Sequence, residues 1–68
     1  MNQRQRKLLL YLLSQKHYQP IQELCGEFGF SEKTMRNDIK AINAYLHMNE
    51  VTSRIQTKRG SGVRMLLM

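Results

Sequence analysis

The stretch "IQELCGEFGFSEKTMRNDIKAINAYL", residues 21 to 46, contains two amphipathic patterns separated by a glycine. The first pattern has apolar residues at i, i+3, i+4 and i+7, the spacing of one buried helical stripe: Ile21, Leu24, Cys25 and Phe28. Gly29 follows directly and can adopt the left-handed conformation that ends a helix, and Ser31 suits the N-cap of the next helix. The stretch therefore predicts two helices joined by a tight turn.

The second pattern predicts a helix from residue 32 to about residue 47 with two distinct faces. At 100° per residue, four apolar side chains fall within about 60° of arc and form the expected core face: Met35, Ile39, Ile42 and Leu46. Four polar side chains without an acid among them lie opposite, over roughly 10 Å of helix: Lys33, Arg36, Asn37 and Lys40. Asp38 lies between the two faces. Three interpretations of this residue are open: it forms a salt bridge, it orients a neighbouring arginine, or it is a plain exposed charge.

A further helix is predicted upstream, from Arg4 to Lys16, because this segment contains no Gly or Pro. Its leucines at helical spacing form the expected core side: Leu8, Leu9, Leu12 and Leu13. Leu10 and Tyr11 lie off this stripe and are either peripheral core contacts or contacts for a partner. Pro20 separates this helix from the next one, since it restricts the residue before it and fits a first helical turn.

Downstream of residue 53 the helical pattern ends and two strand-like segments follow. "RIQTK" (54–58) and "VRMLL" (63–67) flank the turn sequence "RGSG", and Ile55 and Thr57 alternate with Gln56 and Lys58. This arrangement is typical of a β-hairpin. The predicted fold is mainly α with a β-hairpin: one domain, residues 1–68, formed as a winged helix-turn-helix of three helices and a two-stranded wing.

Composition favours a polyanionic partner for this chain. Its 68 residues include 11 Lys and Arg against five Asp and Glu, a net charge of +6. Nucleic acid is the first expectation, while an anionic membrane surface and plain solubility are the alternatives. The single cysteine cannot form an internal disulfide, which suits a reducing cytoplasm, and the run from Leu8 to Leu13 is too short to span a membrane. His17 and His47 have no second ligand at metal spacing, so no metal or cofactor is expected.

The polar stripe on residues 33 to 40 has the side chains that distinguish DNA bases. Arg36 can form a bidentate hydrogen bond with guanine and Asn37 with adenine, in a major groove wide enough to admit a helix. Lys33 and Lys40 can reach guanine or phosphate. Ser31 and Thr34 stand at the helix N-terminus, where free backbone N–H groups and the helix dipole favour a phosphate, although Ser31 is also expected to cap the helix.

The hairpin supplies more positive charge. Lys58 and Arg59 are expected at its tip and Arg64 on the returning strand, where they could contact phosphates or the minor groove. A solvated basic turn is the alternative. The same two interpretations, phosphate contact or solvated terminus, are open for the basic residues of the N-terminal segment: Arg4, Arg6 and Lys7.

Residues 4 to 67 resemble the N-terminal winged helix-turn-helix of bacterial transcription activators with phosphotransferase-system regulation domains, such as the mannitol and lichenan operon activators. The similarity lies in "RQRKLLLYLL" (4–13), "IQELCGEFGFSEKTMRNDIKAIN" (21–43) and "IQTKRGSGVRMLL" (55–67). In that family the wing turn is Lys-Arg-Gly-x-Gly, matched here by Lys58, Arg59, Gly60, Ser61 and Gly62.

Near relatives in pattern are the DeoR-type repressors and the biotin-operon repressor, whose recognition helices contain Thr-x-Arg-x-Asp. Residues 34 to 38, "TMRND", approximate this pattern. Members of the activator family are much longer, so the resemblance implies that this chain is the DNA-binding domain excised from a longer regulator of sugar uptake or metabolism.

The leading functional hypothesis is sequence-specific binding of double-stranded DNA for transcriptional regulation of a bacterial operon. A homodimer is expected in the intact protein, because one short helix contacts only a few base pairs. The alternative is a winged helix that contacts RNA or protein, with Leu10 and Tyr11 in the working surface. An enzyme is not expected, since the chain has no nucleophile–base pair, no paired carboxylates in an apolar setting and no phosphate-cradling loop before a helix.

Overall fold

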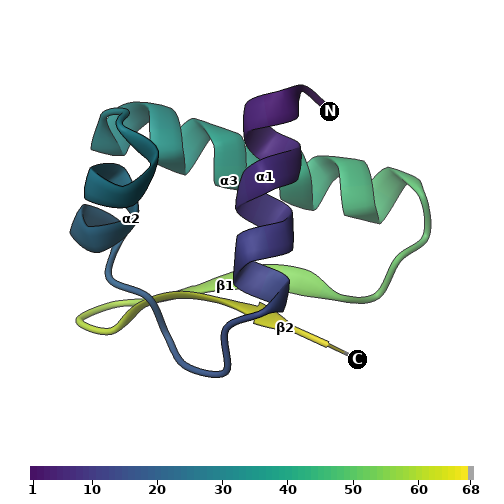
Figure 1. Ribbon diagram of the computed structural model, residues 1–68. Helices are drawn as coiled ribbons and strands as arrows, with labels where there is room; N and C mark the ends of the chain where they lie inside the picture. The colour runs from purple at the N-terminus through teal and green to yellow at the C-terminus, as the bar shows by residue number, and fades with distance from the viewer. Residues whose placement is uncertain (68) are drawn as a thin grey trace.

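The computed structural model describes residues 1–67 and contains, within them, three helices followed by one antiparallel hairpin (Figure 1). The elements are α1 (Gln3–Leu13), α2 (Ile21–Phe28), α3 (Glu32–Met48), β1 (Arg54–Lys58) and β2 (Gly62–Leu66). In Figure 1, α1 lies across α3, α2 stands beside the N-terminal end of α3, and the hairpin lies below the helices. The predicted mainly-α fold with a hairpin is confirmed; Met68, where the predicted domain ends, lies outside the described residues.

The turn between α2 and α3 forms as the sequence predicts. Gly29 has φ 74°, in the left-handed region, and its N–H donates to the Cys25 carbonyl at 2.8 Å. The Ser31 side chain then caps α3 by accepting a hydrogen bond from the Thr34 N–H at 3.2 Å. Because a side chain at φ 74° is strained, the glycine allows α2 to stop and α3 to start within three residues.

The predicted core face of α3 is confirmed, since all four of its apolar side chains are buried: Met35, Ile39, Ile42 and Leu46. On α1, Leu8 and Leu12 are completely buried, but the prediction for Leu13 is wrong, because this side chain is 45% exposed. At 100° per residue Leu13 points about 140° away from Leu8, outside the narrow stripe of α1 that meets its neighbours. None of the helices within residues 1–67 is long and apolar enough to cross a membrane.

The aromatic side chains close the gap between α1 and α2. Tyr11 packs edge-on against Phe28, with ring centroids 5.5 Å apart and planes at 89°. The centroid of the Phe30 ring lies 6.0 Å from that of Phe28. This geometry is the favourable one for aromatic pairs. Tyr11 is therefore a peripheral core contact, whereas Leu10, the other residue off the stripe, is 61% exposed.

The predicted ends of α1 and β2 differ from the structure by one to three residues. Helix α1 spans Gln3–Leu13 rather than Arg4 to Lys16. At its end the Ser14 and Gln15 N–H groups donate to carbonyls three residues back, at 3.1 and 3.2 Å, in place of the i−4 bonds of an α-helix. Strand β2 begins at Gly62, one residue earlier than predicted. Ile55 is buried but Thr57 is exposed, since the tip of the hairpin extends beyond the helices.

A short segment before α2 pairs with the hairpin and fixes its position. The Gln19 N–H donates to the Val63 carbonyl at 2.7 Å, and the Val63 N–H donates to the Gln19 carbonyl at 2.9 Å. Nearby, the Tyr18 hydroxyl donates to Gln56 Oε1 at 2.7 Å. The chain that leads into α2 is thus held to β2 by backbone bonds and to β1 by a side chain.

Gly62 is the residue that permits this close approach. Its φ is 113°, and a Cβ atom at this position would lie 2.0 Å from the Gln19 carbonyl oxygen. Gly60, at the hairpin tip, has φ 84° but no atom within 4 Å of its would-be Cβ.

We expect Gly62→Ala to destabilise the domain by about 2–4 kcal/mol, because backbone strain is added to a backbone clash. Gly60→Ala is the matched control, with strain alone and a cost of about 1–2 kcal/mol. Urea unfolding of both variants measures the difference. Equal losses in the two variants would show that Gln19 moves away without cost.

Candidate nucleic-acid interface

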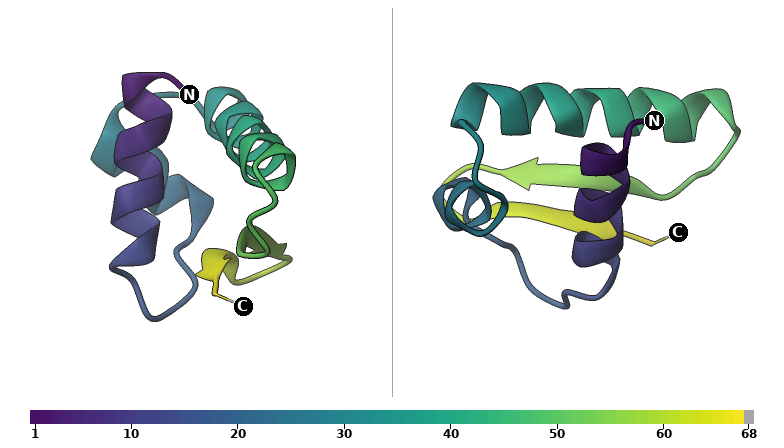
Figure 2. Two further views of the ribbon diagram at one scale, coloured as in Figure 1. Left: turned by 90° about the vertical axis from the view of Figure 1, so that its right-hand side faces the viewer. Right: turned by 45° about the horizontal axis from the view of Figure 1, so that its top comes forward.

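The four polar residues predicted on the outer side of α3 share one exposed surface. Figure 2 (left) looks along α3 and shows α1 and the hairpin on one side of the helix, with its other side uncovered. All four side chains are exposed: Lys33, Arg36, Asn37 and Lys40. We call these four residues the α3 stripe. Because the buried side chains of α3 point the opposite way, the core and the stripe do not compete for the same residues.

One member of the α3 stripe has an acidic neighbour that the sequence pattern did not include. Arg36 Nε and Nη2 both donate to Glu32 Oε1, at 3.1 and 2.9 Å. Both side chains are about half exposed, and an exposed i,i+4 pair contributes little to stability. The pair therefore orients the guanidinium without preventing its exchange to another acceptor.

The two hydroxyl groups at the start of α3 are bonded to each other. Ser31 Oγ accepts from the Thr34 N–H and donates to Thr34 Oγ1 at 3.1 Å. The expected capping role of Ser31 is thus present. The Thr34 hydroxyl proton is left for an acceptor outside the helix.

The hairpin tip lies near the α3 stripe. Lys58 and Arg59 are exposed, and together with Arg36 they line a hollow of about 420 Å³ beside the N-terminal end of α2. Lys58 Nζ also stands 5.6 Å from the centroid of the Tyr18 ring, a cation–π distance. The structure therefore brings one residue of the α3 stripe together with two of the three predicted wing residues.

Arg64, the third predicted wing residue, lies elsewhere. It is half-buried in the middle of β2 and lines a separate hollow of about 360 Å³ with Lys16 and the end of α1. Among residues 1–67 its Nε is a buried nitrogen for which no hydrogen-bond partner is found. The hollow that Arg64 lines lies at the end of α1 and does not include the hairpin tip.

Asp38 forms a salt bridge with α1 that orients α3. Arg4 Nε donates to Oδ2 at 2.6 Å and Arg4 Nη2 to Oδ1 at 2.9 Å, while Gln5 Nε2 donates to Oδ1 at 3.1 Å. Asp38 is only 2% exposed. The hydrogen bonds from Arg4, opposed by burial and helped by the bond from Gln5, hold the Asp38 pKa below its ordinary value. Of the three interpretations open from the sequence, the structure shows the salt bridge.

Arg4 is thereby engaged with a protein carboxylate, and its guanidinium also lies 5.3 Å from the centroid of the Phe30 ring. Arg6 and Lys7 remain exposed on α1. The pairing of Arg4 with Asp38 joins residues 34 positions apart, so no local sequence pattern could have indicated it.

Asn43 fixes the distance between α3 and the hairpin. Its Nδ2 donates to the Ile55 carbonyl at 2.9 Å, and its Oδ1 accepts from the Ile55 N–H at 2.8 Å. These bonds satisfy the two backbone groups of Ile55 that point away from β2. Sequence reasoning missed this residue, because an asparagine on a helix flank gives no signal of its partner.

A family model for the HTH domain matches residues 4–64, from the beginning of α1 almost to the end of β2. The chain belongs to the helix-turn-helix (HTH) domain family. Among the curated proteins and solved structures compared with it, none matches. HTH domains bind DNA with the second helix of the motif in the major groove, and in this HTH domain that helix is α3. Within residues 1–67 the HTH domain has no group of three His, Cys, Asp or Glu side chains that could hold a metal ion.

We expect the stability of the HTH domain to fall in acid as Asp38 becomes protonated. Because its folded-state pKa is lowered, the salt bridge stabilises the fold fully above the ordinary pKa of about 4 and is lost as pH falls through the folded-state pKa. Asp38→Asn should cost about 1–3 kcal/mol at pH 7, the range for hydrogen bonds to a charged group. The difference in free energy of unfolding between Asp38→Asn and the parent should be smaller at pH 2 than at pH 7.

Urea unfolding at both pH values measures this difference. Glu32→Gln is the control, since it removes an exposed acid from the same helix and should change stability by less than about 0.5 kcal/mol. A loss for Asp38→Asn that is the same at pH 7 and pH 2 would contradict a role for the Asp38 charge.

Proposed function

We propose that this HTH domain binds double-stranded DNA sequence-specifically, with α3 in the major groove. The observation that supports it most is the α3 stripe: four exposed polar side chains without an acid among them, directly opposite a buried core face. The net charge of +6 supports it further, because phosphate neutralisation supplies a large share of DNA affinity. The proposed function is binding without catalysis.

The proposed base contacts are made by the α3 stripe. Arg36 is suited to guanine and Asn37 to adenine, while Lys33 and Lys40 reach guanine or a neighbouring phosphate. Thr34 and Ser31 would contact a phosphate at the start of α3. Lys58 and Arg59 would contact phosphates or the minor groove from the hairpin tip, and Arg64 would support the wing from within β2.

We further propose that the domain serves transcriptional regulation of a bacterial operon for carbohydrate uptake or metabolism. The support is the resemblance of residues 4–67 to activators with phosphotransferase-system regulation domains, above all the wing turn Lys58–Gly62. A homodimer in the intact protein would place two copies of α3 on successive turns of one DNA face.

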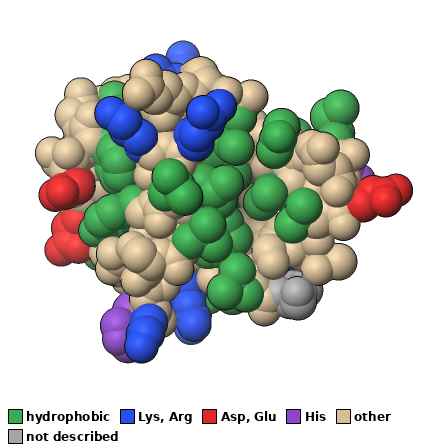
Figure 3. Space-filling view, turned by 45° about the vertical axis from the view of Figure 1, so that its right-hand side comes forward, with side chains coloured by type: hydrophobic (Ala, Val, Ile, Leu, Met, Phe, Trp, Pro, Cys, Tyr) green, Lys and Arg blue, Asp and Glu red, His purple; other side chains and the backbone are tan. Residues whose placement is uncertain are grey.

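A second candidate function, contact with a protein partner, is favoured by an apolar surface away from the α3 stripe. Figure 3 shows apolar side chains gathered at the centre of the face that carries α1. Leu10 on α1 is 61% exposed, although Tyr11 is occupied by its contact with Phe28. A partner bound to this surface would be compatible with DNA on α3.

Fluorescence anisotropy tests the first candidate function, binding of duplex DNA. The domain is titrated into a pool of randomised duplex DNA and into a matching pool of single-stranded RNA, each over a series of salt concentrations. Tighter and steeply salt-dependent binding to the duplex is the expected result. Equal binding to both pools would overturn groove recognition and direct the search to protein partners.

If residues of the α3 stripe contact bases, their replacement should lower both the affinity for DNA and the preference for particular base pairs. Arg36→Ala or Asn37→Ala should each cost about 1–3 kcal/mol on the selected best duplex and relax the preference at one base pair. Competition among duplexes changed at single positions measures this loss. A uniform loss over all sequences would instead assign the residue to phosphate binding.

The hairpin tip should act through charge alone. Replacement of Lys58 or Arg59 by Gln should lower the slope of log affinity against log salt by about one unit each. Lys16→Gln, an exposed position after the C-terminal end of α1, is the control for a general charge effect. An unchanged slope for the tip variants would show that the hairpin does not touch the duplex.

A further inference from the structure

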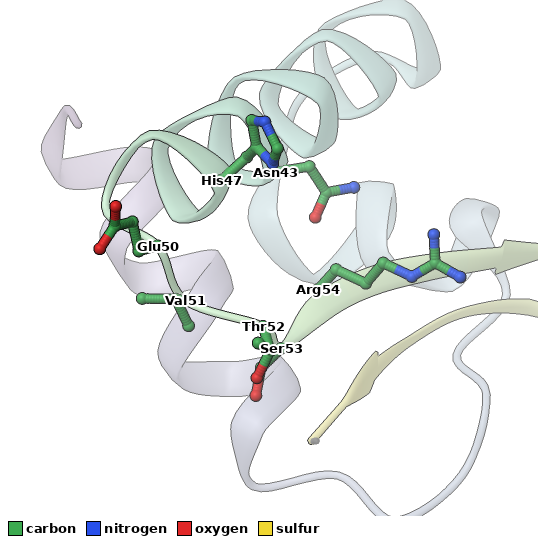
Figure 4. A pocket seen from close by; sticks show the side chains of 7 residues that line it. All are labelled: Asn43, His47, Glu50, Val51, Thr52, Ser53 and Arg54. Atoms are coloured by element: carbon green, nitrogen blue, oxygen red, sulfur yellow. The ribbon is translucent and has the colours of Figure 1, made fainter.

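A second hollow lies at the C-terminal end of α3, away from the hairpin tip. It has a volume of about 640 Å³. Figure 4 shows its seven lining residues, from the last turns of α3, the following loop and the start of β1: Asn43, His47, Glu50, Val51, Thr52, Ser53 and Arg54. The roles proposed above for the α3 stripe and the hairpin tip leave this hollow unused.

His47 continues the α3 stripe into this hollow. It is exposed and follows Lys40 by seven residues, which returns it to within about 20° of the same side of the helix. Ala44 lies between them, exposed and too small to keep another molecule at a distance. The uncovered side of α3 is therefore polar or small from Lys33 to His47.

Arg54 provides a positive charge on the other side of the hollow. It is exposed at the first position of β1, and Lys58 is exposed at the last position of the same strand. The backbone next to Arg54 cannot drift from α3, because both hydrogen-bonding groups of Ile55 are held by Asn43. The base of the Arg54 side chain is thus fixed at the hollow that His47 also lines, while its guanidinium extends along β1, away from His47 (Figure 4).

The two hollows stand at opposite ends of α3. Arg36 lines the one at the hairpin tip and His47 the other, and their separation of eleven positions corresponds to about 16 Å of helix. The major groove is about 12 Å wide and has a phosphate strand on each side. We propose that His47 and Arg54 bind a backbone phosphate of the same duplex, on the strand across the groove from the phosphates at the hairpin tip.

Glu50 is the acid on the rim of this site. It has φ 58°, although it is not a glycine, and ends α3 with N–H bonds from Glu50 to the His47 carbonyl and from Val51 to the Leu46 carbonyl. Figure 4 shows its carboxylate turned away from the Arg54 guanidinium. A phosphate can therefore approach Arg54. Because the Glu50 charge still repels an anion nearby, removal of this charge should favour phosphate binding.

This inference rests on the proposed function, and salt-dependent binding to a duplex of about 20 base pairs, two helical turns, tests it. Arg54→Gln should weaken binding about 5- to 10-fold near 0.1 M salt and lower the salt slope by about 0.9, the effect of one lost phosphate contact. Glu50→Gln should tighten binding. Lys16→Gln is the control. It removes an exposed charge just after the end of α1, beside the hollow that Arg64 lines, and should have little effect on the salt slope.

The outcomes separate the two proposals. If the parent domain does not prefer the duplex, the proposed function itself fails. If the parent binds but Arg54→Gln behaves like Lys16→Gln, the phosphate site is overturned and the groove model survives. Circular dichroism of each variant confirms that the fold is retained, which is expected because all three substituted side chains are exposed.

Discussion

Helix α3 is constrained on both sides, and the rest of the structure depends on how this constraint is met. Met35 and Ile42 on its inner side are completely buried, so the helix supplies the centre of a small core. The α3 stripe on its outer side must stay uncovered if it is to bind a groove. A domain of 68 residues has only one core. Helices α1 and α2 and strand β1 pack against this one helix, and β2 joins the core through β1 and α1.

Polar anchors determine how α3 is held. Asp38 bonds to Arg4 and thereby to α1, Asn43 bonds to the backbone of β1, and the Ser31 cap fixes the turn from α2. A buried carboxylate is unfavourable unless it is paired and hydrogen-bonded, and this pairing is met only in one arrangement of α1 and α3. The anchors therefore add orientation to a core whose apolar contacts are less directional.

The hairpin is positioned by the chain that precedes α2 as well as by its own turn. The paired backbone of Gln19 and Val63, and the bond from Tyr18 to Gln56, connect the wing to the helix-turn-helix. A two-stranded hairpin alone is marginally stable in water. These bonds hold the hairpin tip near Arg36, and the hollow that Arg36 and the tip line together follows from that placement.

Local sequence patterns were sufficient to predict the elements, the turn and the polar stripe. Each of these depends on residues within a few positions of one another: the helical spacing of Met35 and Ile42, the glycine at position 29, and the RGSG turn. The tertiary structure alone decided the partner of Asp38, the role of Asn43, the need for Gly62 and the separation of Arg64 from the hairpin tip. These depend on residues distant in the chain, such as Arg4 and Asp38 or Gln19 and Gly62, and side-chain periodicity contains no information about which distant groups meet.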